Sequence, residues 1–497
     1  MKITILYTKK SSRSLRALSL QGSLRAPLLL INGGRQSFAY PGNPFSSPRI
    51  SDPHARSRPP PLPPPPLSLT HRPLHPHQPP PPPSLPLLHP SASPLLLPLS
   101  LPPAFHHVRT LPSHSAVATL IHAYSLLSPD ILLWCRSHRP AAILADFFFP
   151  WTHRLAADLA VPRLVFYGVG PLLVSIFHRL WLDLPRPADP AALISFPSIP
   201  GSPSFPFSHL PSLYRLYVAG SGSPEWDFLR DEMVAGESAW AAVINTFDAL
   251  DGVYLCHLKG EMKFNRVFAV GPIHPAVDRA GGTDVVAEEL VAWLDGSPAK
   301  SVVYVCFGSQ FTHDMAQGRA LGEALERSGA RFVWCVGSDR VAGSDGKLVP
   351  EGFEERVKGR GMVVRGWALQ VEILRHRAVT SFLTHCGWNS VLEGMVAGVM
   401  LLAWPMEADQ FLNVRLLVEE AGVAVLACAG GPEIVPDPEE LGKLLAESVN
   451  ANAFVETRAR SVEMGRKAKE AVLEGGSSFR DMEALVAELS ELGLHNA

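Results

Sequence analysis

The sequence predicts an α/β protein with two doubly wound domains, each built on a mainly parallel sheet, that face each other across a cleft. Its 497 residues exceed what one ordinary hydrophobic core supports. Short apolar runs alternate with amphipathic stretches along most of the chain, which indicates βαβ units. The apolar runs are nearly continuous, as at residues 302–307, which is typical of parallel strands buried on both faces.

In the first half, the alternation begins near residue 141. We expect strands at 141–146, 163–168, 241–247 and 266–271, with helices at 151–159 and from 168 to about 182. In the second half, we expect helices at 317–328 and 410–421. The strands predicted there lie at 301–307, 331–336, 362–366, 379–384, 399–404 and 423–427.

These patterns divide the chain into an atypical segment (1–107), an N-terminal domain (108–272), a linker (273–286), a C-terminal domain (287–478) and a terminal helix (479–497). We expect the terminal helix to pack back on the N-terminal domain. Residues 59–103 contain 20 prolines in 45 positions, so polyproline II or disorder is expected there.

Three interpretations of this segment stay open. It could be a ligand for SH3-type domains or a spacer, or an organelle transit peptide. An artefact of coding-sequence assembly is favoured, because the acid-poor composition ends abruptly near Asp130.

Composition excludes several classes of function. A formal net charge of −2 argues against a nucleic-acid or anionic-membrane partner. The six cysteines form no C-x-x-C pair, so we expect a reducing, cytoplasmic location and no metal site. No run of about 18 apolar residues lacks charges, so we expect no membrane span and, for want of other signals, a monomer.

The functional prediction depends on one block, residues 367–410 (WALQVEILRHRAVTSFLTHCGWNSVLEGMVAGVMLLAWPMEADQ). A strand at 379–384 leads through a glycine turn into a helix, and free N–H groups at such a helix start bind anions such as a diphosphate. His385, Asn389 and Ser390 add donors to this anion site. Glu393, one turn further, suits the paired hydroxyls of a ribose.

Other residues of the block suit the rest of a nucleotide sugar. Trp367 offers a stacking face for a planar base, and Asp409 and Gln410 suit sugar hydroxyls. Each of these residues alone would more often have an ordinary structural role. Their joint order and spacing within one segment favour the functional interpretation instead.

The block resembles the signature box of plant secondary-product UDP-glycosyltransferases. The matching positions are Trp367, Gln370, His385, Gly387, Trp388, Asn389, Ser390, Glu393, Asp409 and Gln410. Residues 303–310 (VYVCFGSQ) are most similar to flavonol-type glucosyltransferases within that family. The resemblance implies the GT-B fold, with acceptor binding in the N-terminal domain. It also implies inverting, metal-independent transfer of glucose from UDP-glucose to a hydroxyl of a flavonoid such as quercetin, or a similar phenolic, with no cofactor.

The resemblance also implies residue roles. Trp367 would stack on uracil, Ala368 and Gln370 would hold base and ribose, and Glu393 would bind the ribose hydroxyls. The diphosphate would be held by Ser309, His385, Asn389 and Ser390, and the sugar would meet Trp388, Glu407, Asp409 and Gln410. Leu369 departs from the family, which usually has proline there, and this change should loosen the uracil loop.

The family's base is a histidine in Gly-His-x-x-Pro, supported by an aspartate for which Asp146 is the match. No Gly-His-x-x-Pro occurs in this sequence, and residues 1–8 resemble the family's second strand. Two alternatives therefore stay open: a catalytically impaired UDP-sugar-binding protein, and a proline-rich interaction protein.

Overall fold

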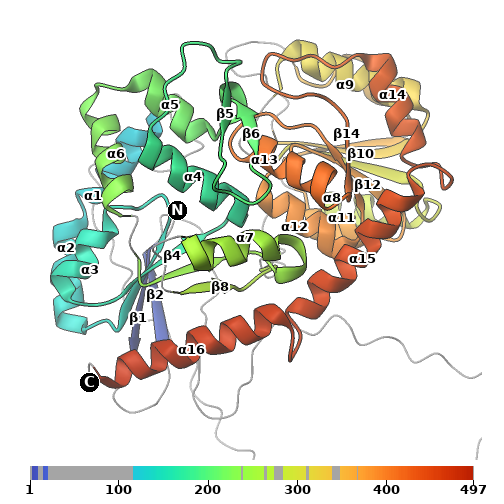
Figure 1. Cartoon of the computed structure of the whole chain (residues 1–497). Coiled ribbons are helices and arrows are strands. Elements are labelled where there is room, and N and C mark those ends of the chain that lie inside the picture. Colours follow the sequence, from blue (N-terminus) through green and yellow to red (C-terminus); the bar gives the residue numbers. More distant parts are fainter. Residues whose placement is uncertain are drawn as a thin grey trace, which may run out of the picture. The chain divides into compact units, whose positions relative to one another are not determined.

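The apolar runs form two six-stranded sheets with helices between the strands (Figure 1). The computed structural model describes residues 3–8, 15–20, 116–236, 239–261, 266–273, 284–308, 313–337, 347–366 and 368–495. Residues 1–36 and 100–497 belong to one unit, and the description concerns its described part.

The N-terminal sheet has the order β2-β1-β3-β4-β7-β8. Its strands are β1 (Ile3–Thr8), β2 (Leu15–Leu20), β3 (Ala142–Asp146), β4 (Arg163–Tyr167), β7 (Ala241–Ile244) and β8 (Val267–Ala269). The last four are parallel and confirm the predicted strands. The connecting helices include α3 (Thr152–Leu159), α4 (Pro171–Asp183) and α7 (Asp248–Glu261).

β1 and β2 place two short pieces of the atypical segment in this sheet. Both strands lie within residues 1–107, where we expected little packed structure, and both pair antiparallel with their neighbours. β1 pairs along the outer side of β3, and β2 is then the edge strand of the sheet. The rest of our expectation for residues 1–107 lies outside the described residues.

The C-terminal sheet is parallel throughout, with the order β11-β10-β9-β12-β13-β14. All six strands fall on predicted runs: β9 (Val302–Cys306), β10 (Arg331–Val336), β11 (Gly361–Arg365), β12 (Val379–Thr384), β13 (Met400–Ala403) and β14 (Ala424–Leu426). The helices around it include α8 (Asp284–Asp295), α9 (Met315–Ser328), α10 (Phe353–Arg356), α11 (Gln370–Arg375), α12 (Trp388–Ala397), α13 (Gln410–Arg415), α14 (Pro438–Glu447) and α15 (Val455–Ala471).

Local sequence explains the helix ends in this half. α9 begins with a capping box. The Asp314 side chain accepts from the backbone amide of Gln317, and the Gln317 side chain accepts from the backbone amide of Asp314. It ends at Gly329, whose φ of 62° suits glycine. The predicted helix 410–421 is α13 followed by a π-helical turn, η5 (Leu416–Glu420). α8 begins at Asp284, so the last residues of the expected linker 273–286 are helical, and residues 274–283 are not described.

The final helix, α16 (Ser477–His495), lies on the N-terminal sheet. Leu485 and Leu489 join a buried cluster with Leu164 of β4 and Val243 of β7. The Ala269 amide donates to Asp481 Oδ2 at 2.7 Å. The end of the chain therefore contributes to the core of its first half.

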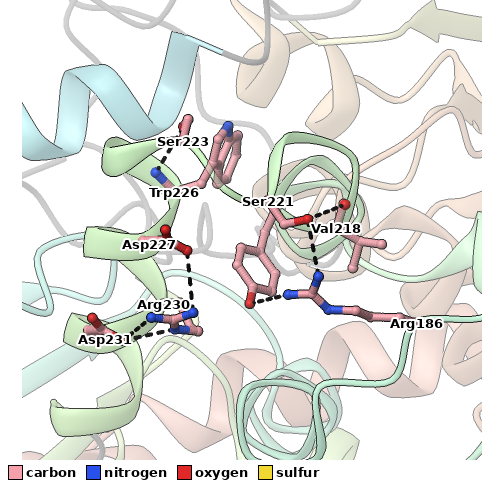
Figure 2. Close-up of polar contacts among 9 residues, drawn as sticks. Arg186, Val218, Ser221, Ser223, Trp226, Asp227, Arg230 and Asp231 are labelled. Atoms are coloured by element: carbon pink, nitrogen blue, oxygen red, sulfur yellow. Dashed lines mark hydrogen bonds and ion pairs between the residues drawn. The ribbon is translucent and has the colours of Figure 1, made fainter.

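Further helices complete the first half: α1 (Val117–Ser125), α2 (Ser128–His138), α5 (Ser212–Gly220) and α6 (Pro224–Ala235). Figure 2 shows how polar contacts fix the turn between α5 and α6, with Arg186 donating to Ser221 Oγ at 3.1 Å and the Trp226 amide donating to Ser223 Oγ. Arg186 also donates to the hydroxyl of Tyr217 at 2.6 Å. Among the described residues no single helix could cross a membrane, although α1 and α2, bent by 42°, meet the length and composition criteria as a pair.

Candidate active site

The turn between β12 and α12 forms the centre of the site. All six residues of β12 are buried, and the strand ends at Thr384. Gly387 then begins α12, whose first internal bond runs from the Val391 amide to the Gly387 carbonyl at 3.0 Å. The N-cap residue of this described helix start, Gly387, makes no side-chain cap. The amides of its first turn, with Asn389 exposed beside them, can therefore hold an anion.

His385 connects this turn to the loop after β9. A Cβ atom at Gly308 would lie 2.8 Å from the His385 ring, and Gly308 has a φ of 73°, so this close approach requires glycine. Burial lowers the pKa of His385 to about 4, so its ring is neutral and donates one hydrogen bond. The expected contacts of Ser309 and Trp367 lie outside the described residues.

The structure brings Gln370, Ser390 and Glu393 together. Gln370 Nε2 donates to Glu393 Oε2 at 2.7 Å and to Ser390 Oγ at 3.2 Å. Burial raises the pKa of Glu393, while this hydrogen bond lowers it. The structure thus places an amide, a hydroxyl and a carboxylate together on the first turns of α11 and α12.

Tyr304 belongs to this group and was missed from the sequence. It is fully buried on β9, and its hydroxyl donates to Gln370 Oε1 at 3.2 Å. A tyrosine inside an apolar strand resembles an ordinary core residue, but a buried hydroxyl needs a partner. The need of a buried tyrosine hydroxyl for a partner was therefore the sequence signal that could have identified Tyr304.

Glu407 and Asp409 lie in the loop before α13, and Gln410, which is 5% exposed, begins the helix. Gln410 Oε1 accepts from the amides of Met406 at 2.7 Å and Glu407 at 3.0 Å, which fixes the loop. Asp409 accepts from Asn413 Nδ2 at 2.8 Å and from the Trp388 amide at the start of α12. The structure therefore brings Asp409 next to the predicted anion site. Asn413, which also donates to the Cys386 carbonyl at 2.9 Å, is a second residue missed from the sequence.

Trp388 connects the start of α12 to the first half of the chain. The residue is only 3% exposed, and its indole N–H donates to the Asn245 carbonyl at 2.7 Å. That Trp388 faces the sugar stays a prediction. A Cβ atom at Gly170 would lie 2.8 Å from this ring. The indole is therefore used to join α12 to the loops after β4 and β7.

Asp146 ends β3 in the other sheet. Its Oδ1 accepts from the Phe148 amide at 3.0 Å, and burial raises the pKa of its carboxyl against the lowering effect of this bond. A cavity of about 50 Å³ lies beside Asp146, and its lining includes the aromatic side chains of Phe147, Tyr167, Phe177 and Trp181. Since a cavity of about 150 Å³ holds one benzene ring, this cavity accommodates a ring substituent or a few waters.

Known proteins resemble this chain over most of its length. The family described as UDP-glucoronosyl and UDP-glucosyl transferase matches residues 257–429. A flavonol 3-O-glucosyltransferase of Arabidopsis thaliana is 42% identical over 429 residues, which cover 83% of this chain and 89% of the relative. A UDP-glycosyltransferase of Stevia rebaudiana is 41% identical over 416 residues, covering 81% and 87%.

Solved structures of plant glycosyltransferases are also similar to this chain. Arabidopsis thaliana UGT89C1 complexed with quercetin has 33% identity and a TM-score of 0.61, over 79% of this chain and 83% of that chain. Its complex with UDP-L-rhamnose has 34% identity and a TM-score of 0.62, over 78% and 83%.

Proposed function

The chain belongs to the plant UDP-glycosyltransferases, enzymes of the GT-B fold, and we propose that it uses UDP-glucose to glucosylate a hydroxyl of a flavonoid or similar phenolic. The observation that carries this proposal is the contact of Gln370 with Ser390 and Glu393 behind the open start of α12. A helix start with its amides available suits a diphosphate, and a carboxylate one turn away suits a ribose.

Each part of the donor then has a place. The first-turn amides of α12, with His385, Asn389 and Ser390, hold the diphosphate, so that the helix dipole rather than a metal offsets its charge. Glu393 and Gln370 hold the ribose next to the uracil loop at Ala368. Asp409 and Gln410 contact the hexose from the loop before α13.

The acceptor part of the proposal is supported by the relatives and by the aromatic cavity. One relative is a flavonol glucosyltransferase, and one structural neighbour binds quercetin. The cavity next to Asp146 has four aromatic residues in its lining, and these suit a substituent of a phenolic ring. We also propose that the protein acts as a cytoplasmic monomer without a nucleic-acid or membrane partner.

A second candidate function is UDP-sugar binding with little transfer. It is favoured by the sequence, which has no Gly-His-x-x-Pro to supply the family's base. A general base contributes about 10²–10⁴-fold to rate. The two candidates share the donor site and differ in turnover.

Calorimetry and a transfer assay test both candidates. UDP and UDP-glucose should bind, and UDP-L-rhamnose should bind more weakly than UDP-glucose. Radiolabelled UDP-glucose with quercetin then measures transfer. Absence of UDP binding would disprove both candidates, and tighter binding of UDP-L-rhamnose would disprove the glucose assignment.

Gln410 carries the sugar assignment. Gln410→His should shift the donor preference from UDP-glucose toward UDP-galactose, because the imidazole cannot accept from the Met406 and Glu407 amides as the amide oxygen does. Competition binding of the two donors measures the shift. An unchanged ranking would show that Gln410 does not contact the sugar.

A further inference from the structure

A segment of the first half lies against α13, the helix that begins with Gln410. The segment comprises β5 (Leu193–Ser195), β6 (Ser204–Pro206) and the turn Phe207–His209. The ring of His209 stacks on Phe411, with centroids 4.0 Å apart and planes 11° apart. Phe411 is 7% exposed, so the stack involves a buried ring.

A second contact holds the other end of α13. The guanidinium of Arg415 lies 5.7 Å from the centroid of the Phe205 ring. Phe411 and Arg415 are four residues apart and share one face of the helix. The segment therefore contacts α13 at its first and last turns, and we call Phe205, His209, Phe411 and Arg415 the α13 contact.

The α13 contact is joined through the helix to Asp409 and Gln410, the residues proposed to bind the hexose. Phe411 directly follows Gln410, whose side chain bonds to the Met406 and Glu407 amides. Asp409 in turn bonds to Asn413 on the same helix. A shift of Phe411 therefore displaces Asp409 and Gln410 together.

From this arrangement we infer that His209 is a positioning residue for the donor sugar: its stack on Phe411 holds α13 where Asp409 and Gln410 meet the hexose. The inference rests on the proposed function, because it needs these two residues to contact the sugar. Burial and nearby Arg215 lower the pKa of His209, so the stack joins two uncharged rings near neutral pH.

The inference predicts that loss of the stack weakens only those binding contacts that involve the hexose. UDP lacks the hexose, so loss of the stack should weaken binding of UDP-glucose and leave UDP binding unchanged. An aromatic pair of this kind is worth about a two- to tenfold change in affinity. If His209 had a merely structural role, its substitution would weaken the binding of UDP and UDP-glucose alike, or of neither.

Calorimetry with UDP-glucose and UDP on four proteins makes the test independent of turnover. His209→Ala should raise the ratio of the Kd for UDP-glucose to the Kd for UDP by about two- to tenfold, and His209→Phe, which keeps a stacking ring, should restore the ratio. The matched control is His138→Ala, because His138 stacks on Trp134 at 3.9 Å and 9° within α2. That control should leave the ratio unchanged.

The outcomes separate the two proposals. If the unaltered chain fails to bind UDP, the proposed function fails and the inference fails with it. If UDP binds normally and His209→Ala leaves the ratio unchanged, the inference alone is wrong. If His209→Ala unfolds, the ratio in His209→Phe decides, since a ratio displaced from that of the unaltered chain contradicts positioning by an aromatic stack.

Discussion

Glu393 shows what one carboxylate contributes to the proposed donor site. It accepts from Gln370 and lies partly buried on α12, where two hydroxyls of a ribose could also donate to it. Glu393→Ala should weaken UDP binding by about 1–3 kcal/mol, the range for unpaired buried polar groups. Calorimetry measures the loss.

Glu463→Ala is a suitable control, because Glu463 pairs with Arg466 on exposed α15. It should leave the Kd for UDP unchanged. A Glu393→Ala protein with the Kd of the unaltered chain would refute the ribose assignment.

Leu369 lies in the uracil loop, directly before α11. We expected Leu369, in place of the family's proline, to loosen this loop. Leu369 has a φ of −76°, within the range that proline imposes, so the loop keeps a proline-like φ without proline. Leu369→Pro should therefore raise the free energy of unfolding by about 0.4–1 kcal/mol, through a less free unfolded chain.

Urea unfolding measures this change in stability. A loss of stability would mean that the Leu369 amide is hydrogen-bonded or that Ala368 cannot precede a proline.

The first turn of α7 contains a buried acid. Asp251 is 1% exposed and accepts from Thr246 Oγ1, and burial raises its pKa to about 7, with the charge of Glu420 adding to the rise. Because the folded pKa exceeds the unfolded value, this group's contribution to stability is complete below about pH 4 and is lost as the pH rises through about 7. The loss amounts to at most about 1.4 kcal/mol per pH unit.

Asp251→Asn should flatten this part of the stability profile, because the amide does not titrate. Urea unfolding of both proteins at several pH values between 4 and 8 gives the comparison. Equal slopes in the two proteins would contradict the assignment of the titration to Asp251.

The resemblance to the family implies that turnover needs a histidine base, and this sequence contains no Gly-His-x-x-Pro. A chain of this sequence should bind UDP-glucose but transfer it about 10²–10⁴-fold more slowly than family members with the histidine. Adding a family-like segment with Gly-His-x-x-Pro before Met1, and removing residues 40–100, should restore transfer to quercetin.

The same addition with alanine in place of the histidine is the control, and it should stay slow. Family-typical turnover by the unaltered chain would disprove the prediction and require another base.

The sequence by itself determined the six strands of the C-terminal sheet, four strands of the N-terminal sheet and the placement of Ser390 and Glu393 on the helix after β12. Hydrophobic periodicity and turn chemistry are local, and the spacing of the 44-residue block fixes which residues follow the same strand and helix.

Only the tertiary structure decided the contacts between distant segments. Trp388 bonds to Asn245, 143 residues away, and Tyr304 to Gln370, 66 residues away. The stack of His209 on Phe411 is of the same kind. A residue's period shows which face of its element is apolar, but which distant side chain fills that face depends on how whole elements pack, and no local pattern encodes that choice.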